Sequence, residues 1–210
     1  MNSTIWDKIY KQYEAGGEAY ATLSRGLNPD FMKFVEKTDF PVKSAFDIGH
    51  GTGHYLVWLK TKGFDVSGID SSKTAHKMAT KALVQDNLTL GDIYEYEIPK
   101  NQFGLILSVH AIHHGLKPQI KKALNSVYEG LVEGGRIYLT LPVNDVHKQW
   151  NTHKNSRLIA PGTFAPTGGP EKGLPHSFYT EDEVKELFKG YSQLSYKLND
   201  RGVWVIIAQK

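Results

Sequence analysis

The chain has 210 residues, of which 40% are hydrophobic and 22% charged, which is enough for one well-buried core and too few for two ordinary domains. It has no cysteine, which excludes disulfides, zinc thiolate sites and a cysteine nucleophile, and its net charge of +3 is too evenly spread to favour nucleic acid as a partner. No apolar stretch approaches the roughly eighteen residues of a membrane span, and the N-terminus lacks the order of a signal peptide, so we expect a cytoplasmic protein without a membrane partner.

The N-terminal segment, residues 1–42, has the pattern of a helical arm. Apolar residues recur at helical spacing over residues 5–13, and glycines interrupt the pattern at residues 16–17. A second helix is expected after Asn28, where Pro29 suits a first turn. We therefore expect two helices before the main sheet begins.

From Lys43 to Leu141, short apolar runs alternate with helical patterns, which is typical of βαβ units and a parallel sheet. The connection over residues 91–102 is barely long enough for a crossover, so a helix there is short or absent. Strands are expected at residues 44–48, 64–69, 88–90, 103–109 and 136–141, and helices at residues 54–62, 73–85 and 118–131.

The last third of the chain begins at Pro142, which closes the fifth strand. Residues 142–178 contain glycine and proline turns without sustained periodicity, so we expect an insertion outside the sheet. Over residues 179–210, a capping box from Thr180 to Glu183 predicts a final helix, and two apolar runs predict a closing hairpin. The expected fold is α/β, with a Rossmann-like, doubly wound, mostly parallel seven-stranded sheet, an antiparallel C-terminal strand and helices on both faces.

A glycine-rich turn follows the first strand, over residues 47–53 (Asp-Ile-Gly-His-Gly-Thr-Gly). Small molecules bind at the carboxyl edge of a parallel sheet, and glycine lets the backbone turn sharply and approach a ligand. Asp70 ends the next strand about twenty residues on, where an acid accepts hydrogen bonds from ribose hydroxyls; the alternative role for Asp70 is to cap the next helix. The dinucleotide fingerprint needs a small residue where His54 stands, which argues against a nicotinamide oxidoreductase.

This turn resembles motif I of the class I S-adenosylmethionine-dependent methyltransferases, and the small-molecule type in particular. The resemblance covers residues 43–141, which would then form the cofactor-binding core. Residues 68–71 resemble the second acidic motif, residues 90–93 the third, residues 103–114 the fourth strand and the turn where methyl donor and acceptor meet, and residues 131–136 the turn into the fifth strand. Two positions depart from the family, which commonly carries Asp at Gly104 and Pro at Glu133.

The resemblance implies S-adenosylmethionine as the cofactor. It assigns the ribose to Asp70, the adenine to Asp92 and Ile93, and the methionine end to the glycine turn with Asp47. The cofactor-binding residues implied are Asp47, Gly49, Gly51, Gly53, Asp70, Ser71, Asp92, Ile93, Ser108 and Val109.

Residues for the acceptor are expected in the helical arm, the insertion and the turn after the fourth strand. His113 and His114 are the candidate catalytic residues, as a base or as groups that orient the acceptor, with a structural role as the alternative for each. The candidate substrate residues are Trp6, Tyr10, His176 and Tyr179; the alternative for the aromatic stripe of the arm is packing on the sheet. Two further histidine pairs, His50/His54 and His110/His113, have helical spacing without an acidic cluster, so we expect no metal.

We expect methyl transfer from S-adenosylmethionine to a small molecule by in-line displacement, achieved mainly through proximity and desolvation. The alternatives are a catalytically silent S-adenosylmethionine-binding module, or a methyltransferase acting on RNA or protein. A monomer or homodimer is expected. The identity of the acceptor, the use of a general base and the pathway stay open.

Overall fold

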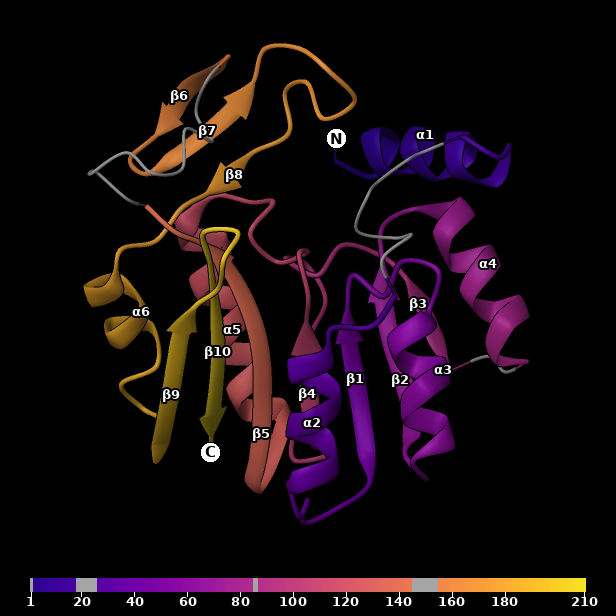
Figure 1. Ribbon diagram of the computed structural model, residues 1–210, viewed down its shortest axis with the longest axis vertical. Helices are drawn as coiled ribbons and strands as arrows, with labels where there is room; N and C mark the ends of the chain where they lie inside the picture. Colours follow the sequence, from indigo (N-terminus) through magenta and orange to yellow (C-terminus); the bar gives the residue numbers. More distant parts are fainter. Residues whose placement is uncertain (1, 18–25, 85–86, 145–154) are drawn as a thin grey trace.

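The computed structural model describes residues 2–17, 26–84, 87–144 and 155–210 (Figure 1). Residue 85, the expected end of the second core helix, and part of the expected insertion lie outside the described residues. No helix within the described ranges is long and apolar enough to cross a bilayer.

One seven-stranded sheet forms the centre of the protein, in the order β3-β2-β1-β4-β5-β10-β9. The first five strands in sequence are mutually parallel, and β10 is antiparallel to both of its neighbours. The strands are β1 (Ser44–Ile48), β2 (Asp65–Asp70), β3 (Leu88–Leu90), β4 (Phe103–Ser108), β5 (Leu131–Pro142), β9 (Gln193–Leu198) and β10 (Val203–Gln209). The predicted fold class is confirmed; the antiparallel strand lies inside the sheet, beside the edge strand β9.

Helices cover both faces of this sheet. Ala45 and Leu105 face α2 (Pro29–Lys37) and α3 (His54–Thr61), with α4 (Lys73–Leu83) on the same side. Phe46 and Ile106 face the other way, toward α5 (Lys117–Gly130) and α6 (Glu181–Leu187). Successive strand residues point to opposite faces, so central strands covered on both sides must be apolar throughout. The six residues of β4 are all buried, as this requires.

Two further elements lie over the carboxyl ends of the parallel strands: α1 (Asn2–Glu14) and a small antiparallel sheet (Figure 1). That sheet consists of β6 (Ser156–Ala160), β7 (Thr163–Pro166) and β8 (His176–Ser177). It lies outside the main sheet, where the sequence predicts an insertion, but its strands were not predicted. They are short and partly exposed, so they carry no periodic apolar pattern.

Some boundaries differ from the prediction. β5 begins at Leu131, five residues before the expected start, because a bulge at Gly134 (φ 75°) shifts its register against β4. Glu133 is exposed within this bulge. At Gly104, where the resemblance leads one to expect Asp, a Cβ would overlap the carbonyl oxygen of Val42, so this backbone requires glycine. As expected, the connection at residues 91–102 contains turns and no helix.

The predicted capping box starts α6. The N–H of Glu183 donates to the Thr180 hydroxyl at 3.2 Å, and the N–H of Thr180 donates to the Glu183 carboxylate at 2.9 Å. These two bonds satisfy backbone donors that the first turn of a helix leaves free.

Candidate functional site

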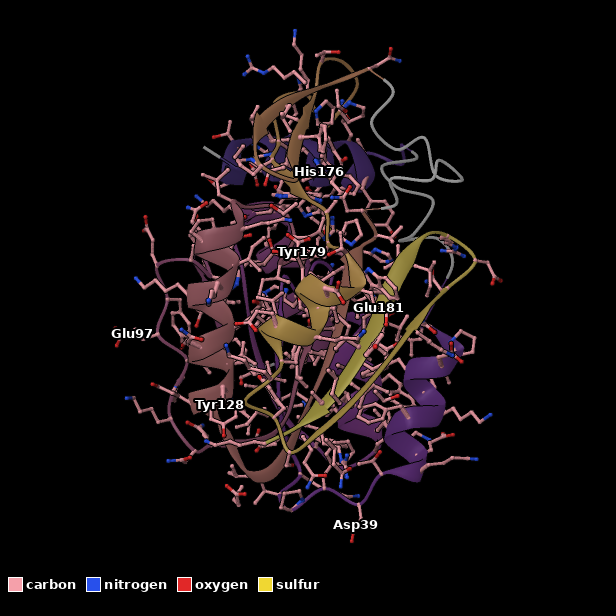
Figure 2. The ribbon with its side chains drawn as sticks, turned by 90° about the vertical axis from the view of Figure 1, so that its left-hand side faces the viewer. Asp39, Glu97, Tyr128, His176, Tyr179 and Glu181 are labelled. Atoms are coloured by element: carbon pink, nitrogen blue, oxygen red, sulfur yellow. The ribbon has the colours of Figure 1, made fainter. Side chains whose placement is uncertain are left out.

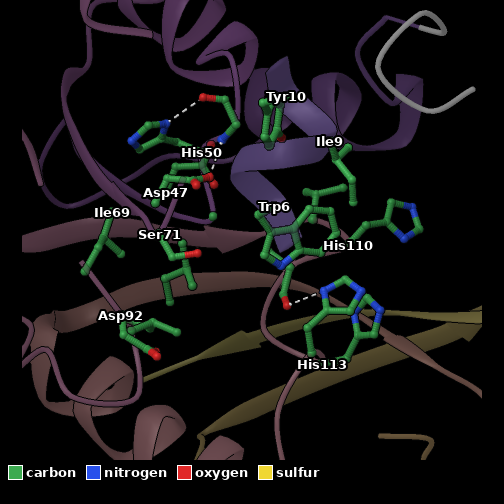
Figure 3. Close-up of a pocket in the computed structure, with 18 of the residues that line it drawn as sticks. Trp6, Ile9, Tyr10, Asp47, His50, Ile69, Ser71, Asp92, His110 and His113 are labelled. Carbon is green, nitrogen blue, oxygen red and sulfur yellow. Dashed lines mark hydrogen bonds between the residues drawn. The ribbon is translucent and has the colours of Figure 1, made fainter. Parts of the chain in front are cut away.

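A cavity of about 330 Å³ opens at the carboxyl ends of the parallel strands, beneath α1 (Figure 3). Its floor comes from the turns after β1, β2 and β4, the place where α/β sheets bind ligands. The predicted site residues that line it are Trp6, Tyr10, Asp47, Gly49, Gly51, Asp70, Ser71, Asp92, Ile93, Val109, His113, His114 and His176.

The glycine-rich turn wraps around the end of β2. The N–H of Gly49 donates to the Ile69 carbonyl at 2.7 Å, and the N–H of Gly51 donates to Asp70 Oδ2 at 2.9 Å. Gly51 has φ 55°, and a Cβ there would lie 2.5 Å from the Tyr10 hydroxyl. Glycine is therefore required at this position both by its backbone conformation and by the close approach of α1.

Asp70 is a buried carboxylate at the end of β2, 8% exposed. Besides Gly51, it accepts a hydrogen bond from the N–H of Ser72 at 2.8 Å. The residue that caps α4 is Ser72, whose hydroxyl accepts from the N–H of Ala75 at 3.1 Å. Capping of α4 by Asp70, the alternative drawn from the sequence, is therefore wrong; this carboxylate orders the glycine turn and faces the cavity.

Asp47 places a second carboxyl on the cavity wall, only 3% exposed. Burial, and then the nearby charge of Asp70, raise the pKa of Asp47 well above its usual range. Two carboxyls sharing one low-dielectric wall favour a cation between them, because its charge offsets both the repulsion and the lost hydration. This end of the cavity suits a ligand with a positive group.

Beyond Asp70, the wall continues through Gly91, Asp92, Ile93 and Tyr94. Asp92 accepts a hydrogen bond from the N–H of Tyr94 at 3.0 Å, which shapes this turn after β3. The Tyr94 hydroxyl donates to the Ile112 carbonyl at 2.7 Å and so ties this turn to the one after β4. The sequence analysis missed Tyr94, because its place depends on a contact between two separate turns.

His110 and His113 line the side of the cavity away from Asp92 in the view of Figure 3. Burial, with their neighbouring histidines, lowers the pKa of both His113 and His114 well below its usual range. Both rings are therefore neutral at physiological pH and keep a lone pair. The indole ring of Trp6 meets the ring of His114 edge-on, with 4.8 Å between centroids.

His176 joins these two rings from β8. One ring nitrogen of each of His113, His114 and His176 lies within 4.8 Å of the others, a group that can hold a metal ion. Glu171 also lines the cavity, with Oε2 3.0 Å from His176 Nε2. Glu171 was missed, and no spacing in the sequence connects it or His176 to the turn at residues 110–115.

His50, His54 and His110 line the cavity as well, although they were considered in the sequence only as possible metal pairs. His110 has φ 55°, rare for a residue other than glycine, and its N–H donates to the Thr140 hydroxyl at 2.8 Å. This conformation turns the chain sharply at the end of β4.

Three predicted site residues lie outside the cavity wall. Gly53 packs against Ala79 of α4, and the Ser108 hydroxyl donates to the Ile48 carbonyl at 3.2 Å. Tyr179 is 2% exposed and packs in the core; Figure 2 shows it between His176 and Glu181 of α6. Each of the three supports the cavity from behind, so their prediction as ligand contacts has no support in the geometry.

Comparison with known proteins identifies a protein family that part of this chain matches. Residues 46–139 match the family described as a methyltransferase domain. An uncharacterized methyltransferase of Staphylococcus carnosus is 32% identical over 109 residues, which cover 50% of this chain and 51% of that protein. The chain thus spans about half the length of this relative.

Solved structures share the fold. A SAM-dependent methyltransferase from Methanosarcina mazei has a TM-score of 0.69 and 20% identity, covering 88% of this chain and 98% of that one. A DhpI–SAM–HEP complex has a TM-score of 0.69 and 16% identity, covering 99% of this chain and 95% of that one.

The matched segment relates this chain to methyltransferase domains, and the solved structures that share its fold include a SAM-dependent methyltransferase and a protein in complex with SAM. The matched family segment begins after the helical arm and ends before β6. It therefore includes the turns after β1, β2, β3 and β4 and leaves out α1 and the small sheet.

Proposed function

We propose that this protein transfers the methyl group of S-adenosylmethionine to a small-molecule acceptor by in-line displacement, mainly through proximity and the exclusion of water. One observation carries the proposal: a single cavity has Asp47 and Asp92 on one side and Trp6, His110 and His113 on the other, and α1 contributes to its lining. Donor and acceptor would meet inside it, where positioning alone can supply roughly 7–11 kcal/mol.

The donor fits the cavity in one orientation. Asp70 accepts hydrogen bonds from the ribose hydroxyls, Asp92 accepts a hydrogen bond from the adenine amino group, and Ile93 packs on the adenine ring. The methionine end lies along the glycine turn, with its ammonium group near Asp47. This orientation directs the sulfonium methyl toward the histidine side, because the adenine occupies the opposite end.

The reaction needs little covalent help from the protein. A lone pair of the acceptor attacks the methyl carbon, the carbon–sulfur bond breaks, and its electron pair stays on sulfur to give S-adenosylhomocysteine. His113 and His114 lie on the acceptor side, where a neutral imidazole can orient the acceptor or take its proton.

A small acceptor is favoured by what covers the cavity. Trp6 from α1, and His176 with Glu171 beside β8, line the side where the acceptor would enter. RNA or a folded protein would need an open groove to reach the methyl group. DhpI, a structural neighbour with this fold, is described in complex with both SAM and HEP.

The test combines binding with turnover. Calorimetry with S-adenosylhomocysteine measures donor binding, and production of S-adenosylhomocysteine is then followed with panels of small thiols, amines, phenols and carboxylic acids, alongside RNA and protein. We expect micromolar donor binding and turnover with one class of small molecule. Binding without any turnover would support the catalytically silent module, and turnover with RNA or protein alone would contradict a small-molecule acceptor.

A further inference from the structure

The backbone holds the three histidines of the cavity together. The N–H of Ser177 donates to the His113 carbonyl at 2.9 Å, and the Ser177 hydroxyl donates to the Gly115 carbonyl at 2.7 Å. These bonds fix β8 against the turn after β4. The ring centroids of His113 and His114 are 3.9 Å apart, and those of His114 and His176 are 4.7 Å apart.

Two of these rings have one nitrogen already bound to the backbone. His114 Nδ1 lies 3.0 Å from the Ala111 carbonyl, and His176 Nδ1 lies 2.9 Å from the Leu174 carbonyl. A carbonyl only accepts, so in each ring Nδ1 is directed at it as the donor, and an ion would be bound through Nε2, which in His176 now faces Glu171 Oε2. Histidines that bind metals are held in this way, with the second nitrogen donating to a carbonyl or carboxylate.

His113 contributes a further observation. Its Nδ1 is buried without a hydrogen-bond partner among the described residues, and an unpaired buried polar atom is costly. The side chain is 6% exposed and lines the cavity. A buried ring with an unpaired nitrogen is suited to bind a ligand that the protein chain does not itself supply.

From this geometry we propose that His113, His114, His176 and Glu171 bind a divalent transition-metal ion of the Zn²⁺ class. Imidazole nitrogens with one carboxylate suit that class, whereas Mg²⁺ and Ca²⁺ prefer oxygen ligands. The proposal departs from the expectation of no metal, which rested on histidine pairs close in sequence. The ligand set instead joins the turn at residues 110–115 to β8.

The distances fit such an ion. In a tetrahedral zinc site with bonds of about 2.0–2.1 Å, neighbouring ligand atoms lie about 3.3 Å apart. Glu171 Oε2 and His176 Nε2 are 3.0 Å apart, close to the spacing that two ligands of one ion require. The histidine nitrogens are within 4.8 Å of one another, and the excess of roughly 1.5 Å over the tetrahedral spacing is within reach of side-chain rotation.

The site faces the cavity in which the acceptor would bind, beside Trp6. An ion of this class can expand to five ligands, so beside the four protein ligands it could ligate a thiol or hydroxyl and lower its pKa; the proton then leaves to solvent and the anion attacks the methyl group. This use of the ion rests on the proposed function, whereas binding of the ion does not.

Metal binding is tested on the full chain without a histidine tag, freed of metal with a chelator. Co²⁺ is added while its visible absorption is followed, and Zn²⁺ then competes for the site. We expect one equivalent of Co²⁺ to bind and Zn²⁺ to displace it. His113→Ala and His176→Ala should each weaken Co²⁺ binding about a hundredfold, and Glu171→Gln about tenfold.

The matched control is His76→Ala, on α4 and outside the cavity wall, which should bind Co²⁺ like the wild type. Binding of S-adenosylhomocysteine shows which variants are folded. Equal Co²⁺ affinity in the wild type, His113→Ala and His176→Ala would overturn the site. Turnover that survives complete removal of metal would overturn the catalytic use of the ion. Absence of turnover with every acceptor would overturn the proposed function. The metal site itself is decided by Co²⁺ binding alone.

Discussion

The carboxylate of Asp7 on α1 accepts a hydrogen bond from the backbone N–H of Thr74 at 2.8 Å, in the first turn of α4. The hydroxyl of Ser72, which caps the same helix, lies 3.3 Å from the same oxygen. Ser72 also donates its N–H to Asp70, so Ser72 connects α1 to the carboxylate that we propose binds the ribose. A change at Asp7 should therefore reach the donor site.

We expect Asp7→Asn to lower the free energy of unfolding by about 1 kcal/mol, the usual effect of one such hydrogen bond, and to weaken S-adenosylhomocysteine binding several-fold. Thermal unfolding and calorimetry measure the two effects. Glu14→Gln, on the same helix, removes an exposed ion pair with Lys77 at 3.6 Å and is the matched control. It should change neither quantity by much, because exposed pairs contribute little.

The same carboxylate should give a pH-dependent contribution to stability. Its hydrogen bond with Lys11 and the N–H of Thr74 lower the pKa of Asp7 from 3.8 to about 2. A carboxyl whose pKa is lowered by folding stabilises the folded state above its unfolded pKa, and this contribution is lost as the pH falls through the folded pKa. The difference in melting temperature between the wild type and Asp7→Asn should persist from neutral pH to about 4 and shrink below it. If the difference in melting temperature stays constant at lower pH, the destabilisation by Asp7→Asn comes from altered packing and not from the lost charge of Asp7.

Asp70→Asn should weaken S-adenosylhomocysteine binding about tenfold to a hundredfold. The change removes charge from hydrogen bonds to the ligand, each worth about 1.5–3 kcal/mol, and disturbs the bond to the N–H of Gly51. Calorimetry gives the affinity. Asp65→Asn, at the exposed opposite end of the same strand, is the control and should bind like the wild type. Equal binding by both variants would remove Asp70 from the donor site.

Donor affinity should depend on the ionisation of Asp47. Because burial and Asp70 raise the pKa of Asp47, lowering the pH protonates this carboxyl and removes the negative charge that attracts the ammonium group of the donor. The affinity for S-adenosylmethionine should thus fall as the pH falls. Asp47→Asn should bind more weakly at pH 8 and show a flatter pH profile in calorimetry.

Ionisation of Asp47 has opposite effects on donor affinity, which it raises, and on the stability of the unliganded protein, which it lowers. A carboxyl whose pKa is raised by folding destabilises the unliganded protein as the pH rises, because its charged form is disfavoured in the fold. Unliganded Asp47→Asn should therefore melt no lower than the wild type at pH 8. A large drop in melting temperature would show that Asp47 supports the fold instead of the ligand.

Gly104→Ala should destabilise the protein by at least about 2 kcal/mol, because the added Cβ would overlap the carbonyl oxygen of Val42 and force the backbone apart. Urea unfolding measures the change. Gly190→Ala is the control, since a Cβ there meets nothing within 4 Å. Comparable stability of the two variants would mean that the segment at Val42 moves freely.

Local chemistry explains which parts of this protein could be predicted from its sequence. The glycine turn, Asp47 and Asp70 were found because a strand, a positive-φ turn and a helix follow one another within a few residues. Ser108 was predicted as a ligand contact and is instead bonded to the Ile48 carbonyl. Whether its hydroxyl is free depends on a neighbouring strand, which a motif does not specify.

The acceptor side was harder to predict for the same reason. His113 and His114 follow β4 directly and were identified, whereas Glu171 comes from a segment without periodicity. Its position is set when β8 pairs with β7 and with the backbone at His113. Strand pairing between distant segments leaves no spacing pattern in the sequence.

The bond between Ser177 and the His113 carbonyl also bears on how this protein can diversify. Every contact proposed for the donor comes from the turns after β1, β2 and β3, while the small sheet contributes His176 to the histidine side of the cavity. Substitutions in β6–β8 can therefore reshape the chamber for a new acceptor and leave adenosyl recognition intact. Exchange of residues 155–177 between paralogues should transplant acceptor preference as a unit.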